Sequence, residues 1–330
     1  MRSIWDLEIP SYLEDIVKFQ DMFSRPPSEE NIPIIESDGE IIYYISVLVR
    51  IRPFELERIA KICLEYGKRG EKFQSALIKM LSYDNMRLVY ELFLAGFCDF
   101  GIILGYLRHY RNFYSHLYFF KENPSFLGKI QKLHSKVKYQ DSFFQKYSKE
   151  LITNERTRDE YINYGAQKNS IEYALKYDEI EILHNSSANP DFDIQGVIEW
   201  SPFEWSLKPD DLNYLTVSAH FGSINCFKAL LMKGSIVNQK VFFCSLHSGN
   251  FDIVHICERF CKIEPIEAIR IASDYWNSDL FDYFASQKTL REPAQSHSFV
   301  RCLLFFLALG VKIETFHRGH ILLFTHFFSF

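Results

Sequence analysis

Hydrophobic positions in residues 213–238 recur at the spacing of a short amphipathic helix. Ile224, Phe227, Leu230 and Leu231 stand at i, i+3, i+6 and i+7, with polar residues among the intervening positions. This spacing places the four side chains on one face of a helix. The segment therefore predicts a short helix that buries a single apolar stripe.

Glycines divide this segment into a two-helix unit. A first short helix is expected to end between Ala219 and Gly222, because a glycine can adopt the positive φ that a tight helix–helix turn requires. Gly234 follows the second helix in the position expected of a C-terminal cap. A unit of this size cannot bury its apolar face alone, so we expect similar units beside it.

The same pattern returns further along the chain at a fixed interval. Gly249 lies 27 residues after Gly222, and Trp276 lies another 27 residues on. Weaker copies are expected upstream, at residues 84–96 and 173–183. Several copies in register indicate a repeat architecture rather than an isolated motif.

Local polar patterns predict two further helix starts. Asn169 and Glu172 fit a capping box, and so do Ser201 and Glu204, with a proline at the first helical position after Ser201. The second pattern predicts a short helix between Trp200 and the tryptophan at position 205, with both indole rings packed between repeats.

We expect three regions along the chain. Residues 1–150 form an N-terminal helical region, interpreted as either separate or built of divergent repeats. Within it, residues 41–49 are a helix or a strand, and a helix begins at Phe54. Residues 151–298 hold the repeats, and residues 299–330 form an atypical segment rich in phenylalanine.

The two-helix unit resembles the ankyrin repeat. The residues that occupy the signature positions of that family are Ala219, Gly222, Leu230, Leu231, Gly234 and Asn238. The chain also resembles degenerate ankyrin proteins that are expanded in some protists and have an uncharacterised N-terminal region. The stretches that carry this second resemblance are residues 170–183, 189–193, 200–205 and 215–231.

This resemblance implies an all-α fold, a helical solenoid of stacked helix–turn–helix repeats. Ankyrin repeats run about 33 residues, whereas these units run 27, so few or no β-hairpins are expected between them. The Thr-Pro-Leu-His start typical of the family is replaced by residues 215–218.

Composition and charge narrow the classes of partner. The chain of 330 residues holds 31 Phe and 19 Tyr but 14 Gly, which favours bulky helix-to-helix packing. A formal net charge of −5 gives no global basic field for nucleic acid. The lysines in residues 129–138 are interpreted as the solvated face of a helix.

Compartment follows from the termini and the cysteines. The first residues carry acidic side chains without an apolar run, so no secretory signal is expected. Seven cysteines then indicate reduced thiols in an intracellular, cytoplasmic protein. The longest strongly apolar run, residues 302–311, is too short to span a bilayer, and we expect a monomer without a transmembrane segment.

No sequence motif indicates catalysis or a cofactor. Phosphate-binding glycine loops, zinc-protease and nucleophile-elbow signatures are absent from the sequence. Cys244 and His247, with Cys257 and Cys261, have spacings compatible with zinc. Cys257, however, aligns with the core position Leu230, so we expect no metal, no cofactor and no enzyme activity.

The remaining hypothesis is a scaffold or adaptor that binds a protein along the concave face of the repeats. In ankyrin proteins, the two residues before the turn glycine often contact partners. The corresponding candidates here are His220, Phe221, His247, Ser248, Asp274 and Tyr275. Two alternatives stay open: the repeats serve a regulatory or catalytic module in residues 1–150, or the segment 299–330 associates with a membrane.

Overall fold

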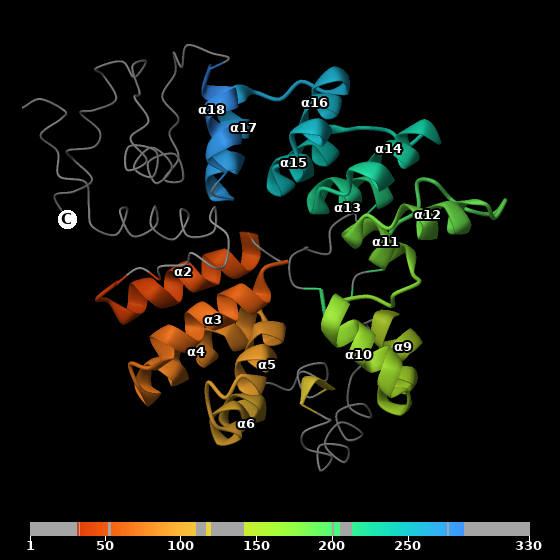
Figure 1. Ribbon diagram of the computed structural model, residues 1–330. Coiled ribbons are helices and arrows are strands. Elements are labelled where there is room, and N and C mark those ends of the chain that lie inside the picture. The colour runs from red at the N-terminus through yellow and green to blue at the C-terminus, as the bar shows by residue number, and fades with distance from the viewer. Residues whose placement is uncertain are drawn as a thin grey trace, which may run out of the picture. The chain divides into compact units, whose positions relative to one another are not determined.

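A computed structural model describes residues 32, 34–51, 54–109, 117–119, 142–199, 201–204, 213–275 and 277–286 (Figure 1). In these ranges the chain forms α-helices, and its only β-type pairing is an isolated antiparallel bridge between Val197 and Asn213. The predicted all-α fold is confirmed. No helix in the described ranges combines the length and the apolar character that crossing a membrane requires.

Contacts divide the chain into two compact units, and the division runs through one helical pair. The larger unit holds Ile34–Ser218 and Asn225–Ser235. The described residues of the smaller unit are 32, 219–224, 236–275 and 277–286. The domain boundary expected near residue 150 remains a prediction.

The N-terminal part of the larger unit is a group of amphipathic helices. They are α2 (Asp38–Ile51), α3 (Leu56–Gly67), α4 (Glu71–Asp84), α5 (Met86–Leu94) and α6 (Phe100–His109). Residues 41–49 are thus helical, and Ile41, Ile45 and Leu48 form a buried stripe on α2. Contacts of α2 with α3 and α4, of α5 with α3 and α4, and of α4 with α6 close this group around its apolar faces.

Aromatic side chains fill the centre of the larger unit. The ring centroids of Tyr90, Phe93 and Phe100 lie 5.5, 5.7 and 6.0 Å from that of Phe119. Phe119 is fully buried. Such tilted and edge-to-face pairs contribute beyond the burial of their area, which agrees with the packing expected from the high Phe and Tyr content.

The second half of the larger unit continues as short helical hairpins. Its helices are α9 (Ser142–Thr153), α10 (Glu155–Tyr164), α11 (Ile171–Tyr177), α12 (Ile180–Ser187) and the greater part of α13 (Tyr214–Phe221) and α14 (Ile224–Met232). Asp178 makes the turn between α11 and α12 with φ of 59°, where the later units have glycine. Its carboxylate accepts from the backbone N–H of Asn225 and Cys226, so it also caps the start of α14.

The smaller unit contains α15 (Gln239–Ser248), α16 (Phe251–Phe260), α17 (Pro265–Asp274) and α18 (Ser278–Ser286). Helix α15 contacts α16 and α17, and α17 contacts α18 (Figure 1). Asn250 and Asn277, 27 residues apart, each accept the backbone N–H three residues later at the start of α16 and of α18. The 27-residue interval therefore has a local structural basis in these caps.

The predicted repeat positions take up regular roles. Gly222 and Gly249 have φ of 74° and 70°, and Gly234 has φ of 100°, as helix-ending turns require. Asn238 accepts from the backbone N–H of Val241 and caps α15. The three remaining positions in the described ranges are core or near-core side chains: Ala219, Leu230 and Leu231.

Both predicted capping boxes are wrong, although a helix, α11, does begin at the first of them. Ser170, not Asn169, caps α11, because its side chain accepts from the backbone N–H of Tyr173. Residues 201–204 form a turn rather than the start of a helix. There the backbone N–H of Glu204 donates to the carbonyl of Ser201, and the Glu204 side chain is used elsewhere.

Several predictions lie outside the described residues. They concern Trp200, Trp276, the tryptophan at position 205, the lysine run at 129–138 and the segment 299–330.

Candidate binding site

The six candidate contact residues lie at the C-terminal ends of three helices, each of which is the first helix of a helical pair. His220 and Phe221 end α13, His247 and Ser248 end α15, and Asp274 with the following Tyr275 ends α17. All six belong to the smaller unit. Because α15 packs against α17, equivalent helix ends are brought together there.

Four of these side chains form one continuous row of rings, here called the ring ladder: Phe221, His220, His247 and Tyr275. The centroids of Phe221 and His220 lie 5.0 Å apart, and those of His220 and His247 lie 5.4 Å apart, both pairs perpendicular. His247 stacks on Tyr275 at 4.1 Å with an interplanar angle of 14°. Each ring thus fixes the orientation of the next.

The two imidazoles are joined by a hydrogen bond. Nδ1 of His220 lies 3.3 Å from Nδ1 of His247, so one nitrogen donates and the other accepts. An accepting nitrogen carries no proton, and this contact therefore requires at least one neutral imidazole. Burial, with the nearby His220 and Arg270, lowers the pKa of His247 to about 3. His247 is accordingly neutral at physiological pH.

The ladder is open to solvent along part of its length. Phe221, His247 and Tyr275 are half-buried, whereas His220 is 9% exposed. The rings are therefore anchored in the protein on one side and accessible on the other. Aromatic groups in this situation are common anchors in protein interfaces.

Ser248 and Asp274 lie beside the ladder rather than in it. The Ser248 hydroxyl donates to the backbone carbonyl of Ser245, which fixes it in the turn before Gly249. Asp274 is 43% exposed and pairs with Arg270 at 3.0 Å, and its partial burial raises the pKa of its carboxyl group. These two residues make the polar border of the site.

Cys244 adds a third metal-type donor to the two imidazoles. It lies one helical turn before His247, and the ligand atoms of Cys244, His220 and His247 all lie within 4.8 Å of one another. Cys257, by contrast, is fully buried in the core. The Cys261 thiol donates to the backbone carbonyl of Val237. The donor group that the structure brings together thus differs from the four residues suggested by sequence spacing.

The buried thiols do not have the environment of an activated nucleophile. Burial raises the pKa of Cys98 and Cys244 to about 11, and that of Cys226 and Cys257 to about 12. Reactive cysteines instead have a pKa lowered by a cation or a helix N-terminus. These four thiols are therefore poor candidates for covalent catalysis.

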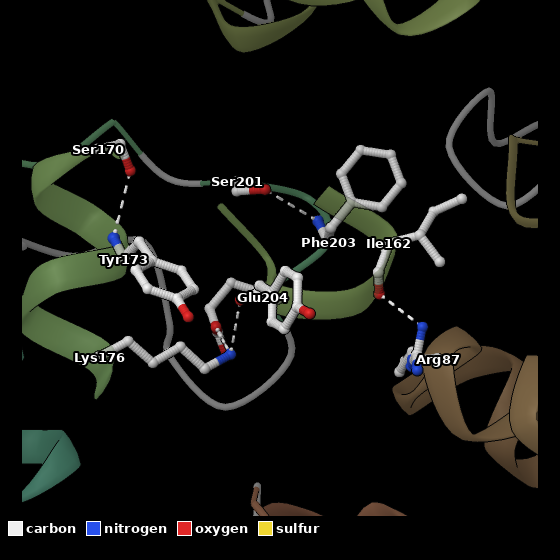
Figure 2. A network of polar contacts seen from close by, with 9 residues as sticks. Arg87, Ile162, Ser170, Tyr173, Lys176, Ser201, Phe203 and Glu204 are labelled. Atoms are coloured by element: carbon white, nitrogen blue, oxygen red, sulfur yellow. Dashed lines mark hydrogen bonds and ion pairs between the residues drawn. The ribbon is translucent and has the colours of Figure 1, made fainter. Parts of the chain in front are cut away.

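A second polar cluster, in the larger unit, corresponds to no motif in the sequence (Figure 2). Lys176 Nζ lies 2.6 Å from Glu204 Oε2 and also donates to the backbone carbonyl of Tyr164 at 3.1 Å. The side chains of Lys176 and Glu204 are 3% and 10% exposed. Glu204 was assigned to a local capping box, but its partner stands 28 residues earlier on α11.

Neighbouring groups extend this cluster to three helices. Arg87 on α5 donates to the backbone carbonyl of Ile162 at 3.0 Å (Figure 2). Arg87 also donates to Asn163 on α10 at 2.6 Å. Arg87 also pairs with Glu91 on its own helix. Since each of these charges has a partner and little contact with solvent, the cluster serves to join helices.

The described part of the larger unit also contains a polar groove of about 860 Å³ along α10. Its lining carries Arg156 and Glu160, which pair with each other at 3.0 Å, together with Lys168. The backbone N–H of Lys168 donates to the same Glu160 carboxylate. Its lining residues include no histidine or cysteine, so it lacks the donors found around the ring ladder.

Comparisons with known proteins give no relative. No protein-family model, no curated protein and no solved structure matches this chain. The resemblance to ankyrin repeats rests on the residues named above, and membership of that family stays a proposal.

Proposed function

We propose that this chain is a non-catalytic protein-interaction scaffold, a solenoid of degenerate ankyrin-like repeats that binds a partner protein through the ring ladder. The observation that carries the proposal is the ladder itself. Its rings come from equivalent helix ends of three successive repeats: Phe221, His220, His247 and Tyr275. Three of these four rings are partly accessible to solvent.

The helix pairs support the repeat interpretation through their turns. Gly222 and Gly249 adopt left-handed conformations at the same point of two units. Asn250 donates from its side chain to the carbonyl of Gly222, which ties one unit to the turn of the preceding one. Such nearest-neighbour contacts are the basis of stability in repeat proteins.

The connections between successive helical pairs favour helix ends as the surface that contacts a partner. Residues 233–238 join α14 to α15, and residues 261–264 join α16 to α17, in both cases without a strand. No β-hairpin therefore extends from these two connections. A partner that approaches the ends of α13, α15 and α17 would contact the ring ladder and its polar border.

The order within the ladder favours tight binding. Stacking and edge-to-face contacts hold His220, His247 and Tyr275 in fixed positions before a partner arrives. Less side-chain entropy is then lost on association than with freely rotating side chains. The acidic border formed by Asp274 and Glu267 around Arg270 favours a partner segment that joins an apolar side chain to a basic one.

Catalysis is not part of this proposal. The thiols of Cys244 and Cys257 lack activation, and the charges of Lys176 and Glu204 are buried and paired. The alternative, a regulatory or catalytic module in residues 1–150 served by the repeats, stays a prediction, as does membrane association of residues 299–330.

Affinity capture from a native lysate tests the proposal. The full chain is compared with the double variant Phe221→Ala and Tyr275→Ala, and bound proteins are quantified by mass spectrometry. A matched control replaces Phe260 and Tyr43, which are 64% and 47% exposed and lie outside the ladder. We expect a set of proteins bound by the wild type and the control but lost from the ladder variant.

Two results would contradict the proposal. In the first, the ladder variant, with a wild-type circular dichroism spectrum, captures the same proteins as the wild type. In the second, the control variant loses the same proteins as the ladder variant, which would mean that exposed aromatic groups in general cause the capture.

A further inference from the structure

Three metal-type donors converge at the inner part of the ring ladder. His220 comes from the end of α13, while Cys244 and His247 stand one turn apart on α15. The donor atoms of all three residues lie within 4.8 Å of one another, and the two Nδ1 atoms lie 3.3 Å apart. The donors thus come from α13 and α15, which are the first helices of two consecutive helical pairs.

These separations resemble those of a zinc site. Zinc binds imidazole nitrogen at about 2.0–2.1 Å and thiolate sulfur at about 2.3 Å, in tetrahedral geometry. Two nitrogens on one zinc ion then lie roughly 3.3–3.4 Å apart, and nitrogen and sulfur roughly 3.6 Å apart. The separation of 3.3 Å between the Nδ1 atoms of His220 and His247 agrees with the first value. The Cys244 sulfur lies within 4.8 Å of a ring nitrogen of each histidine, so it would have to move closer by at most about 1.2 Å to reach the separation of a zinc site.

We propose that His220, Cys244 and His247 bind one zinc ion, with the fourth position open to water or to a side chain of a bound protein. Two imidazoles and a thiolate suit zinc, whereas calcium and magnesium require oxygen ligands. His247 is partly exposed, which leaves an approach from solvent. Zinc would fasten α13 to α15 at the centre of the ladder.

The protonation states fit this proposal. The hydrogen bond between the two Nδ1 atoms requires at least one neutral imidazole, and a neutral imidazole is the form that binds metal. Zinc displaces the thiol proton of Cys244 into solvent, and the proton between the two Nδ1 atoms moves to an Nε2 atom. Because zinc binding releases this thiol proton, zinc affinity increases with pH.

Neighbouring groups are compatible with a bound cation. Arg270 is the nearby positive charge that affects His247. Its guanidinium pairs with Glu267 at 2.6 Å and with Asp274 at 3.0 Å, so two carboxylates outweigh it. Tyr275 stacks on His247 and holds the imidazole ring in its orientation. Residues that contact the ligands of a metal site commonly orient them in this way.

Cobalt titration of the full chain tests the site without any partner protein. The protein is treated with a chelator, kept reduced and titrated with Co²⁺ while its visible and near-ultraviolet absorption is recorded. We expect tetrahedral Co²⁺ bands and a thiolate-to-cobalt charge-transfer band at the ladder site, both removed by added Zn²⁺. Cys244→Ala should abolish the charge-transfer band, and the control Cys261→Ala should keep it.

Zinc affinity measured by competition with a chromogenic chelator completes the test. Loss of a residue that contacts a metal ligand, without binding the metal itself, weakens metal affinity roughly 10- to 100-fold. His220→Asn removes a ligand, so it should weaken zinc affinity by more than this range. Cys244→Ser, close in size to the wild-type side chain, serves as a second variant in case Cys244→Ala does not fold. Zinc should raise the Tm of the wild type and of Cys261→Ala, but not that of Cys244→Ser.

The site would be overturned by a wild-type chain that binds neither ion. It would also be overturned by Co²⁺ bands and zinc affinity that persist in the folded Cys244→Ser and His220→Asn variants, since the metal would then lie elsewhere. Failure of this test leaves the partner-binding proposal intact, because Phe221→Ala with Tyr275→Ala changes no metal ligand.

Discussion

The ring ladder and the Lys176 cluster are both groups of polar side chains that link separate helices, but their surroundings differ. In the Lys176 cluster, an ion pair of 2.6 Å is nearly withdrawn from solvent, and a backbone carbonyl accepts a further bond from Lys176. In the ladder, two imidazoles share a bond of 3.3 Å beside half-exposed aromatic rings.

This difference in exposure is the basis for the binding role that we propose for the ladder. The Lys176 pair is already matched and shielded, so a ligand would have to displace Glu204 to use the charge. The ladder keeps accessible ring faces and a donor group whose bond a metal can replace. Residual exposure of ordered side chains, rather than polarity alone, distinguishes the candidate site.

The largest expected effect is on stability, at the Lys176 cluster. Glu204→Gln removes the carboxylate and leaves a buried ammonium group without its counter-charge. Breaking a buried pair in this way costs about 3–5 kcal/mol. The free energy of unfolding from urea titration checks this value.

A matched control sharpens this first prediction. Lys146→Ala removes an ion pair with Glu199 at 3.4 Å, but Lys146 is 61% exposed, so we expect about 0–1 kcal/mol. Equal losses for Glu204→Gln and Lys146→Ala would contradict the structural role of the buried pair.

The next effect concerns the turn that spaces the ladder. Gly249→Ala forces a positive φ of 70° on alanine, and the new Cβ would collide with the Asn277 side chain that caps α18. We expect a loss of roughly 2–3 kcal/mol from both causes. Gly234→Ala, with φ of 100° and no atom within 4 Å of its Cβ, should cost only about 1–2 kcal/mol. Thermal unfolding of both variants measures the difference, and a reversed order would contradict this view of the turn.

The third effect depends on pH and belongs to the ladder. The pKa of His247 falls from 6.5 to about 3 in the folded chain, so the unfolded chain binds more protons between these values. The free energy of unfolding therefore decreases as pH falls below about 6.5, by at most about 2 kcal/mol at pH 5. His247→Gln should lack this component, and parallel curves for the two proteins would refute the assignment.

The smallest expected effect is the coupling between two stacked rings. A double-mutant cycle with His247→Ala and Tyr275→Ala should give about 0.5–1.5 kcal/mol of interaction free energy. Chemical denaturation of the wild type, both single variants and the double variant measures it. A coupling near zero would show that the stacking at 4.1 Å does not order the ladder.

Local and periodic features of the fold could be predicted from the sequence. The glycines at 222 and 249 and the apolar stripe around Leu230 follow from conformational preference and helical spacing, and the structure shows them in those roles. The 27-residue interval also predicts equivalent helix ends for His220 and His247, and the structure places them near the ends of α13 and α15.

Contacts between distant residues could not be predicted in this way. Ser201 and Glu204 matched a capping box, but Glu204 gains more from the buried Lys176 than from a local cap. The zinc-compatible spacing joins Cys244 and His247 to later cysteines, whereas the structure places His220 of the preceding helical pair beside them. The spacing of residues along the chain does not reveal which helices pack against each other.

The most direct test of the central claim measures binding and stability on the same proteins. A partner found by capture is titrated against the wild type, the ladder variant Phe221→Ala with Tyr275→Ala, and the control variant of Phe260 and Tyr43. We predict that the ladder variant stays folded and binds at least about tenfold more weakly, a loss of roughly 1.4 kcal/mol or more, while the control keeps wild-type affinity. Unchanged affinity in a folded ladder variant would contradict the claim that the ring ladder is the binding site.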